Sequence, residues 1–211
     1  MDNQKLIIIG IIILVFIFII YSINLIIKKN SGHKILYKGY DLYYGDNATY
    51  IGNESMEDSL EHIKYTFSIW IRTINLGANT EWDNDANKPK TILYNNGSPN
   101  IMYLRKDNII QIQFMYRNND GIKTLYNLNL ENIEGQNWIN LIITVNDRKV
   151  NIYKNGELYK SKLLPNVNIK SYKILTIGEN GNNFNGYIGK LEYFNYDIDD
   201  IKALKLYNFN K

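Results

Sequence analysis

The sequence feature that most constrains the fold is an apolar stretch over residues 6–27, which polar groups interrupt only at Tyr21, Ser22 and Asn24, near its end. A helix rises about 1.5 Å per residue, so this stretch covers roughly 30 Å, the thickness of the hydrocarbon core of a bilayer. A lone segment in lipid must satisfy its own backbone hydrogen bonds. We therefore expect a single transmembrane helix, with Leu6 and Ile27 as its end residues.

A cleaved secretory signal is the alternative interpretation of the same stretch. The apolar part of such a signal runs about 7–15 residues and is followed by a cleavage site of small residues. Here the apolar stretch is longer, and it continues into Lys28 and Lys29 without an Ala-x-Ala pattern. We therefore expect an uncleaved signal-anchor over residues 1–29 and one further domain over residues 30–211.

The lysines around the apolar stretch predict its orientation. Only Lys5 precedes the stretch, whereas Lys28, Lys29, Lys34 and Lys38 follow it closely. The positive-inside rule places the cationic flank in the cytosol, so we expect a single-pass membrane protein whose second domain faces the cytosol. The absence of cysteine fits a reducing compartment.

Three N-glycosylation triplets favour the opposite, extracellular orientation. They begin at Asn47, Asn53 and Asn96. The chain is rich in asparagine, so such triplets also arise by chance. The extracellular orientation stays open as the alternative.

Composition excludes one class of partner and suggests a source. The formal net charge is only +3 and the cationic residues are spread along the chain, so we expect no nucleic-acid partner. Isoleucine, asparagine, lysine and tyrosine are abundant. Their codons are rich in A and T, which indicates an A/T-rich genome more than any particular function.

Alternating apolar and polar residues after the stretch predict β-strands. The predicted strands cover residues 65–72, 109–116, 138–145, 149–153, 157–161, 172–177 and 186–194. Asn155-Gly156 lies between two apolar runs and is a strong hairpin signal, and Asp147-Arg148 forms a second tight connection. We expect the three strands between 138 and 161 to form a meander, and we place Trp70 and Trp138 in the core of a sandwich or jelly roll.

Two segments have helical spacing instead. Residues 54–63 could form a short surface helix. A second helix is expected over residues 199–207, with Asp199 as its N-cap and with Ile201, Leu204 and either Leu206 or Tyr207 facing inward.

Three ordered motifs resemble the laminin-G-like group of the concanavalin A-like lectin and glucanase superfamily. They are Phe-Ser-Ile-Trp-Ile at 67–71, the tryptophan-led strand at 138–145 followed by Tyr-Lys-Asn-Gly at 153–156, and residues 184–196 followed by the Asp199 helix. Together they span roughly residues 34–208. The resemblance implies an all-β fold, a concanavalin A-like jelly-roll sandwich preceded by the transmembrane helix. Fold alone does not define function, because the superfamily contains lectins, hydrolases and adhesion modules.

A catalytic centre is not evident in the sequence. Related hydrolases place two carboxylates at alternating positions of one strand, and no predicted strand carries that pattern. Glu192 stands alone on its strand, with Asp197 in the following turn. We find neither a cysteine nucleophile nor a Gly-x-Ser-x-Gly or zinc-ligand motif, so we expect no enzyme and no catalytic residue.

One acidic loop is the candidate ligand site. Trp82 could stack on a sugar face, while Asp83, Asn84 and Asp85 offer oxygen atoms to sugar hydroxyls. The same loop could bind Ca²⁺ through Asp83 and Asp85, as related domains do with loop oxygens; a plain acidic loop with Trp82 packed over the sandwich edge is the alternative. We otherwise expect no cofactor.

The function we expect is a non-catalytic, membrane-anchored interaction module that binds a protein or a glycan. The A/T-rich bias and the cytosol-facing topology suggest a virion-membrane or minor capsid component of a large DNA virus. An exported, lectin-like surface protein that binds carbohydrate is the alternative, and a glycoside hydrolase is disfavoured.

Overall fold

The computed structural model describes residues 3–29, 32–39, 41–43, 48–51, 63–74, 88–95, 98–167, 175–179, 184 and 186–209. The chain divides into two units, Met1–Gly32 and His33–Lys211. The first unit contains helix α1 (Asn3–Lys29), and the second contains every strand and helix α2.

Helix α1 carries apolar side chains that are exposed to solvent. Phe16 is 63% exposed and Phe18 is 69% exposed. In the described part of the chain no helix is long and apolar enough to cross a membrane, so the span predicted between Leu6 and Ile27 is not supported by the structure.

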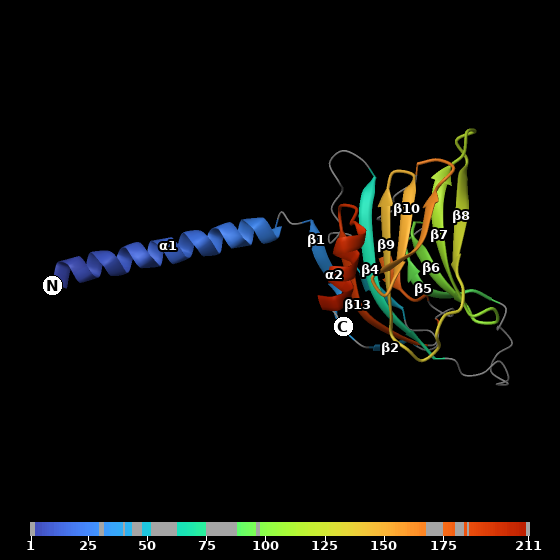
Figure 1. The fold of residues 1–211 in the computed structure, drawn as a ribbon, viewed down its shortest axis with the longest axis horizontal. Helices are drawn as coiled ribbons and strands as arrows, with labels where there is room; N and C mark the ends of the chain where they lie inside the picture. The colour runs from blue at the N-terminus through green and yellow to red at the C-terminus, as the bar shows by residue number, and fades with distance from the viewer. Residues whose placement is uncertain are drawn as a thin grey trace. The chain divides into compact units, whose positions relative to one another are not determined.

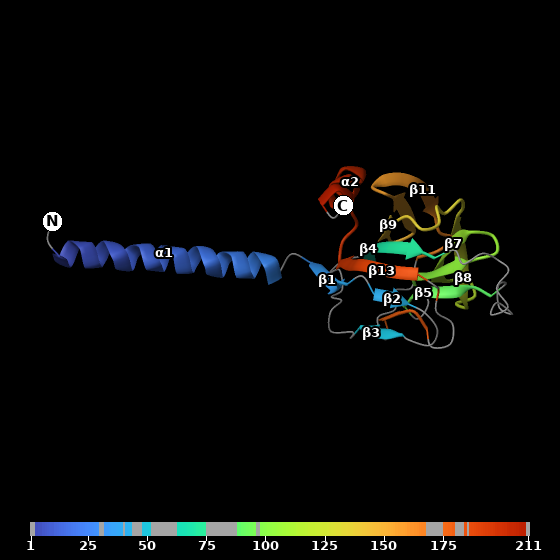
Figure 2. The same cartoon turned by 90° about the horizontal axis from the view of Figure 1, so that it is seen from below.

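The second unit is an all-β sandwich of two antiparallel sheets (Figures 1 and 2). The larger sheet has the order β1-β13-β4-β9-β10-β11, with β2 also paired to β13. Its strands are β1 (His33–Tyr37), β2 (Asp41–Tyr43), β4 (Lys64–Thr73), β9 (Ile139–Asn146), β10 (Lys149–Lys154), β11 (Glu157–Leu163) and β13 (Gly186–Phe194).

The smaller sheet has the order β3-β12-β5-β6-β7-β8. Its strands are β3 (Thr49–Ile51), β12 (Leu175–Ile177), β5 (Lys90–Tyr94), β6 (Asn100–Leu104), β7 (Ile109–Arg117) and β8 (Lys123–Leu130). Figure 1 shows the two sheets as facing layers. The predicted sandwich is therefore confirmed.

The core lies between the two sheets and follows from strand alternation. In β4 the inward residues Phe67, Ile69 and Ile71 are buried, and they belong to the same apolar cluster as Ile112 and Phe114 of β7. Since side chains alternate along a strand, the residues between them point to the outer face of the larger sheet.

The predicted meander is confirmed. Strands β9, β10 and β11 pair in sequence order. Asn155 and Gly156 both have positive φ, at 54° and 81°, as the predicted hairpin turn requires. Strand β9 is buried along residues 139–145, as expected for a central strand covered on both faces.

The predicted C-terminal helix is confirmed as α2 (Asp200–Phe209). The carboxylate of Asp199 accepts a hydrogen bond from the Lys202 amide at 2.8 Å, so Asp199 caps the helix. The expected inward face is confirmed in part: Leu206 packs against the sheet and Tyr207 stacks on Trp70, whereas Ile201 is 67% exposed and Leu204 is 46% exposed. The closest packing is made by Ala203, which is fully buried and whose small side chain permits a close approach. The other predicted helix, over residues 54–63, lies almost entirely outside the described residues.

Candidate functional site

The outer face of the larger sheet carries side chains that the core does not use. On β4 these are Ser68, Trp70 and Arg72, which alternate with the buried Phe67, Ile69 and Ile71. Trp70 and Arg72 are half-buried.

Helix α2 covers part of this outer face. Ile142 of β9 and Tyr153 of β10 point away from the main core and form a second apolar cluster with Ile198 and Ala203. All four side chains are almost completely buried. At the other end of the helix, the ring of Tyr207 stacks on Trp70 with 5.7 Å between ring centroids.

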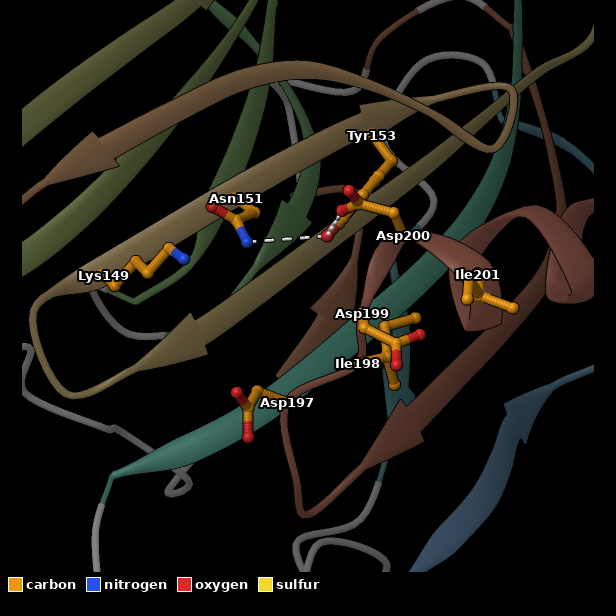
Figure 3. A pocket seen from close by; sticks show the side chains of 8 residues that line it. All are labelled: Lys149, Asn151, Tyr153, Asp197, Ile198, Asp199, Asp200 and Ile201. Carbon is orange, nitrogen blue, oxygen red and sulfur yellow. Dashed lines mark hydrogen bonds between the residues drawn. The ribbon is translucent and has the colours of Figure 1, made fainter.

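A pocket of about 530 Å³ lies where the chain enters α2 (Figure 3). Its lining consists of Lys149, Asn151, Tyr153, Asp197, Ile198, Asp199, Asp200 and Ile201. Three carboxylates and one ammonium group therefore face this space.

The polar groups of the pocket hold its walls together. The Tyr153 hydroxyl donates a hydrogen bond to Asp200 at 2.8 Å, and the Asn151 amide contacts the same hydroxyl at 3.5 Å (Figure 3). Asp197 accepts a hydrogen bond from the Asn146 amide at 2.9 Å. With the cap at Asp199, every carboxylate of the pocket fixes a strand or the helix in place.

The Tyr153 hydroxyl is strongly held in its protonated form. Burial raises the pKa of Tyr153 to about 12, and its hydrogen bond to the Asp200 carboxylate adds to the effect. Both causes disfavour a phenolate, because the charge would be desolvated and would lie beside a second anion. Tyr153 is therefore a hydrogen-bond donor that locks α2 to the sheet.

The pocket is a poor match for glycoside hydrolysis. Asp197, Asp199 and Asp200 are all exposed to solvent, whereas the general acid of a glycosidase is a carboxyl group whose surroundings keep it protonated. Among the described residues, the buried carboxylate is that of Glu192, which is 1% exposed.

Glu192 makes a buried ionic contact at the junction of β1 and β13. Its Oε1 atom lies 2.7 Å from Lys190 Nζ and 3.0 Å from His33 Nε2. Burial tends to raise the pKa of Glu192, but the hydrogen bonds and charges of His33 and Lys190 outweigh it and hold that pKa below its usual value. The His33 ring stacks on Phe194 at 4.3 Å. An ionised, paired carboxylate of this kind fastens strands and does not donate a proton.

Four aromatic rings form a continuous surface at the other end of the outer face, and we call them the aromatic row: Tyr187, Trp138, Trp70 and Tyr207. The Tyr187 and Trp138 rings lie 6.4 Å apart, and Trp70 stacks on Tyr207. All four side chains are half-buried.

Gly189 joins the two halves of the aromatic row. A Cβ atom at this position would lie 2.9 Å from Trp70 Cβ and 3.3 Å from Trp138 Cζ3. The absence of a side chain at Gly189 thus lets both tryptophans lie against the sheet.

Arg72 is the charged member of this surface. Its Cζ atom lies 5.6 Å from the centroid of the Tyr187 ring, and its Nε atom donates a hydrogen bond to the carbonyl of Gln136 at 2.8 Å. Tyr187 is its cross-strand partner on β13, and the register of β4 with β9 places Trp138 on its other side. Within the described residues, the two terminal nitrogens of Arg72 have no hydrogen-bond partner.

The structure revises the placement of two tryptophans, and the predicted loop site lies outside the described residues. Trp70 and Trp138 are not in the core, because both belong to the half-buried outer face. Trp82, Asp83, Asn84 and Asp85 lie outside the described residues, so the predicted ligand and calcium site stays a prediction. Within the described residues, no group of three or more acidic or histidine side chains could hold a metal ion.

Sequence reasoning missed Arg72, Tyr187 and Gly189. The signal for Arg72 was present, since alternation along β4 places it on the same side as Trp70. The pairing of Tyr187 with Arg72 depends on strand order and register, which the local pattern does not contain.

The two facing antiparallel sheets define the class of the protein as a jelly-roll-like β-sandwich. The family model described as the concanavalin A-like lectin/glucanases superfamily matches residues 44–200. The chain belongs to this superfamily, as its motifs predict. A search of the curated proteins finds none that matches this chain.

Solved structures with a similar fold include botulinum neurotoxin binding domains. One is the binding domain of botulinum neurotoxin DC in complex with SialylT, at 17% identity and a TM-score of 0.60, covering 85% of this chain and 46% of that one. The same domain in complex with rat synaptotagmin II has 18% identity and a TM-score of 0.58, covering 85% and 46%. This chain therefore spans less than half the length of those structures, and at such identities the likeness shows the fold alone.

Proposed function

We propose that this domain is a non-catalytic interaction module that binds a glycan or a protein through the outer face of its larger sheet. The observation that carries the proposal is the aromatic row, which stays half-buried beside Arg72, whereas α2 buries Ile142 and Tyr153 at the other end of the outer face. Aromatic rings with one polar partner combine a large contact area with a fixed orientation, as binding surfaces require.

The carboxylates support binding over catalysis. Glu192 is buried, ionised and paired, and the three aspartates of the pocket each accept a hydrogen bond that fixes the fold. Retaining and inverting glycosidases both need one carboxyl group to act as a proton donor. None of these four carboxyl groups is arranged for that role.

The similar structures suggest the two ligand classes of the proposal, a glycan and a protein. The binding domain of botulinum neurotoxin DC forms one complex with SialylT and a second complex with rat synaptotagmin II. Such domains show that a scaffold of this shape occurs in proteins that bind glycans and proteins. This chain covers only 46% of either structure. That it binds the same classes of ligand is therefore part of the proposal.

A glycan array tests this function directly. The full chain in detergent should bind a subset of glycans, and Trp138→Ala should abolish that binding. Tyr50→Ala is the matched control, since Tyr50 is 72% exposed on β3 of the smaller sheet. Equal binding by all three proteins would remove the aromatic row as the site, and no binding by any of them would leave the glycan class without support.

We also propose, from the sequence alone, that residues 6–27 tether the domain to a membrane with the domain in the cytosol. The apolar length and the lysines that follow it support the tether, although the described residues contain no helix that could span. In a large DNA virus such a module would link the virion membrane to the capsid. Protease protection in microsomes tests the topology. An accessible, unglycosylated domain supports this orientation, whereas a protected, glycosylated one supports an exported lectin.

The loop with Trp82 remains a second proposed contact. Asp83 and Asp85 could bind Ca²⁺, and Asn84 could bond a sugar hydroxyl. Titration of Ca²⁺ into the wild-type chain and into Asp83→Asn, followed by calorimetry, tests this contact. If both proteins give the same heat of Ca²⁺ binding, the carboxylate of Asp83 does not bind the ion.

A further inference from the structure

We propose that the aromatic row and Arg72 bind an acidic glycan, with Arg72 pairing to a carboxylate or sulfate group of a sugar whose apolar face rests on the rings of Tyr187 and Trp138. This inference rests on the proposed function and names its ligand class. It assigns the charge selectivity to Arg72 alone.

The position of Arg72 supports an anionic ligand. The Gln136 carbonyl holds the Nε atom at 2.8 Å, so the side chain has a fixed direction. The two terminal nitrogens, which have no hydrogen-bond partner within the described residues, can form the paired hydrogen bonds that a planar guanidinium makes with carboxylate or sulfate. No carboxylate forms a salt bridge with this guanidinium in the described part of the chain, so its positive charge is not neutralised locally.

The rings on either side of Arg72 support a sugar. Tyr187 lies on β13 and Trp138 directly precedes β9, while Arg72 is on β4 between them. Their rings lie 6.4 Å apart and are inclined by 52°. A sugar ring has an apolar face of C–H groups that packs on an aromatic ring, and its substituents then reach sideways to polar groups. In this arrangement a charged substituent on the sugar would meet Arg72.

The competing explanation is that Arg72 only stabilises the fold. Its position over the Tyr187 ring and its hydrogen bond to the Gln136 carbonyl would be enough for such a role. The two explanations differ in one measurable property. A structural arginine changes the melting temperature, whereas a ligand-binding arginine changes the preference between acidic and neutral forms of the same glycan.

The experiment uses the full chain in detergent and an array of matched glycan pairs. One set of pairs differs only in a carboxylate-bearing sugar, and a second set differs only in a sulfate group. We expect the wild-type chain to bind the acidic member at least about tenfold more tightly, since a hydrogen bond between two charged groups is stronger than one between neutral groups. The set that shows the preference identifies which anion is recognised. Binding should also weaken as salt is raised.

Two variants locate the effect. Arg72→Gln should lose the preference for the acidic member, and Arg72→Lys should retain it in part, because lysine keeps the charge without the planar fork. Arg117→Gln is the matched control: Arg117 is an exposed arginine on β7 that also bonds a single carbonyl, that of Gly121, at 2.9 Å. Equal preference in Arg72→Gln and wild type would overturn the assignment.

The remaining outcomes separate this inference from the function on which it rests. If the aromatic row binds only neutral glycans, or binds an acidic peptide in place of a glycan, the inference fails while the binding module stands. If the full chain binds neither kind of glycan nor peptide, both fail. The comparison within the wild-type protein keeps the test valid even where Arg72→Gln does not fold.

Discussion

The two ends of the outer face of the larger sheet differ in how their side chains are used. At the start of α2, Tyr153 is buried and bonded to Asp200, and the neighbouring carboxylates each fix part of the fold. At the far end, beyond the stack of Tyr207 on Trp70, the rings of Trp138 and Tyr187 stay half-buried beside Arg72.

The two ends show that one short helix covers only part of the sheet. Helix α2 is ten residues long and buries Ile142 and Tyr153, while Trp138 and Tyr187 beyond it stay half-buried. In the proposed function, the strands serve the fold under the helix and contact a ligand beyond it. Mutations at the two ends, and in the core beneath them, should therefore separate stability from binding.

The largest effect is expected in the core. Phe67→Ala removes a fully buried ring from the inner face of β4 and should reduce the free energy of unfolding by about 3–5 kcal/mol. Chemical denaturation measures this loss. A change below about 1 kcal/mol would mean that the inner face is not the core of the folded protein.

The buried ionic contact should come next. Glu192→Gln removes the charge that pairs with Lys190 and His33, and a loss of about 1.5–3 kcal/mol is expected. Because the folded-state pKa of Glu192 lies below its usual value of 4.5, the wild-type contribution is complete above about pH 4.5 and disappears as the pH falls through the folded-state value. Unfolding curves from pH 7 to pH 3 should fall more steeply for wild type than for Glu192→Gln. Parallel curves would contradict this role.

A smaller stability effect is expected in the aromatic row. Trp138→Ala removes a half-buried ring, so the loss should be about 1–2 kcal/mol, less than for the buried Phe67. Ligand binding should nevertheless disappear. If Trp138→Ala still binds the ligand but loses as much stability as Phe67→Ala, then Trp138 serves the fold and not the binding of a ligand.

The smallest effect is expected under α2. Tyr153→Phe removes the hydroxyl bonded to Asp200 and should cost about 1 kcal/mol at neutral pH. The pKa of Tyr153 is raised from 10.0 to about 12, so its contribution is complete below pH 10 and is lost as the pH rises towards 12. Tyr153→Phe should not show this loss of stability at alkaline pH, and its ligand binding should stay unchanged. Chemical denaturation of wild type and Tyr153→Phe at pH 8 and pH 11 measures the difference in stability.

Most of the fold could be predicted because it depends on local patterns. Alternation marked β4, β7 and β13, Asn155-Gly156 marked a hairpin, and Asp199 marked the start of α2. The buried face of α2 was predicted only in part, since Leu206 and Tyr207 pack inward as expected, but Ile201 and Leu204 are exposed and Ala203 is the buried residue. Helical spacing shows which residues share a face of α2. Which of those faces packs closest depends on the surface of the sheet, which the local sequence of the helix does not contain.

The candidate site was harder to predict because it is assembled from distant residues. Tyr187, Arg72 and Trp138 meet only through the order β13-β4-β9. Trp70 and Trp138 are predicted to lie in the core, but alternation along β4 already puts Trp70 on the face opposite Phe67 and Ile69. The loop predicted from its acidic composition, with Trp82, lies outside the described residues.

The central claim is that the ligand occupies the aromatic row, and side-chain footprinting tests it most directly. The full chain, with and without a bound glycan, is exposed to hydroxyl radicals and analysed by mass spectrometry. The account predicts that the glycan protects Trp138 and Tyr187, while the exposed Tyr50 and Tyr159 are modified as before. Protection of Tyr50 or Tyr159 with unchanged modification of Trp138 and Tyr187 would contradict it.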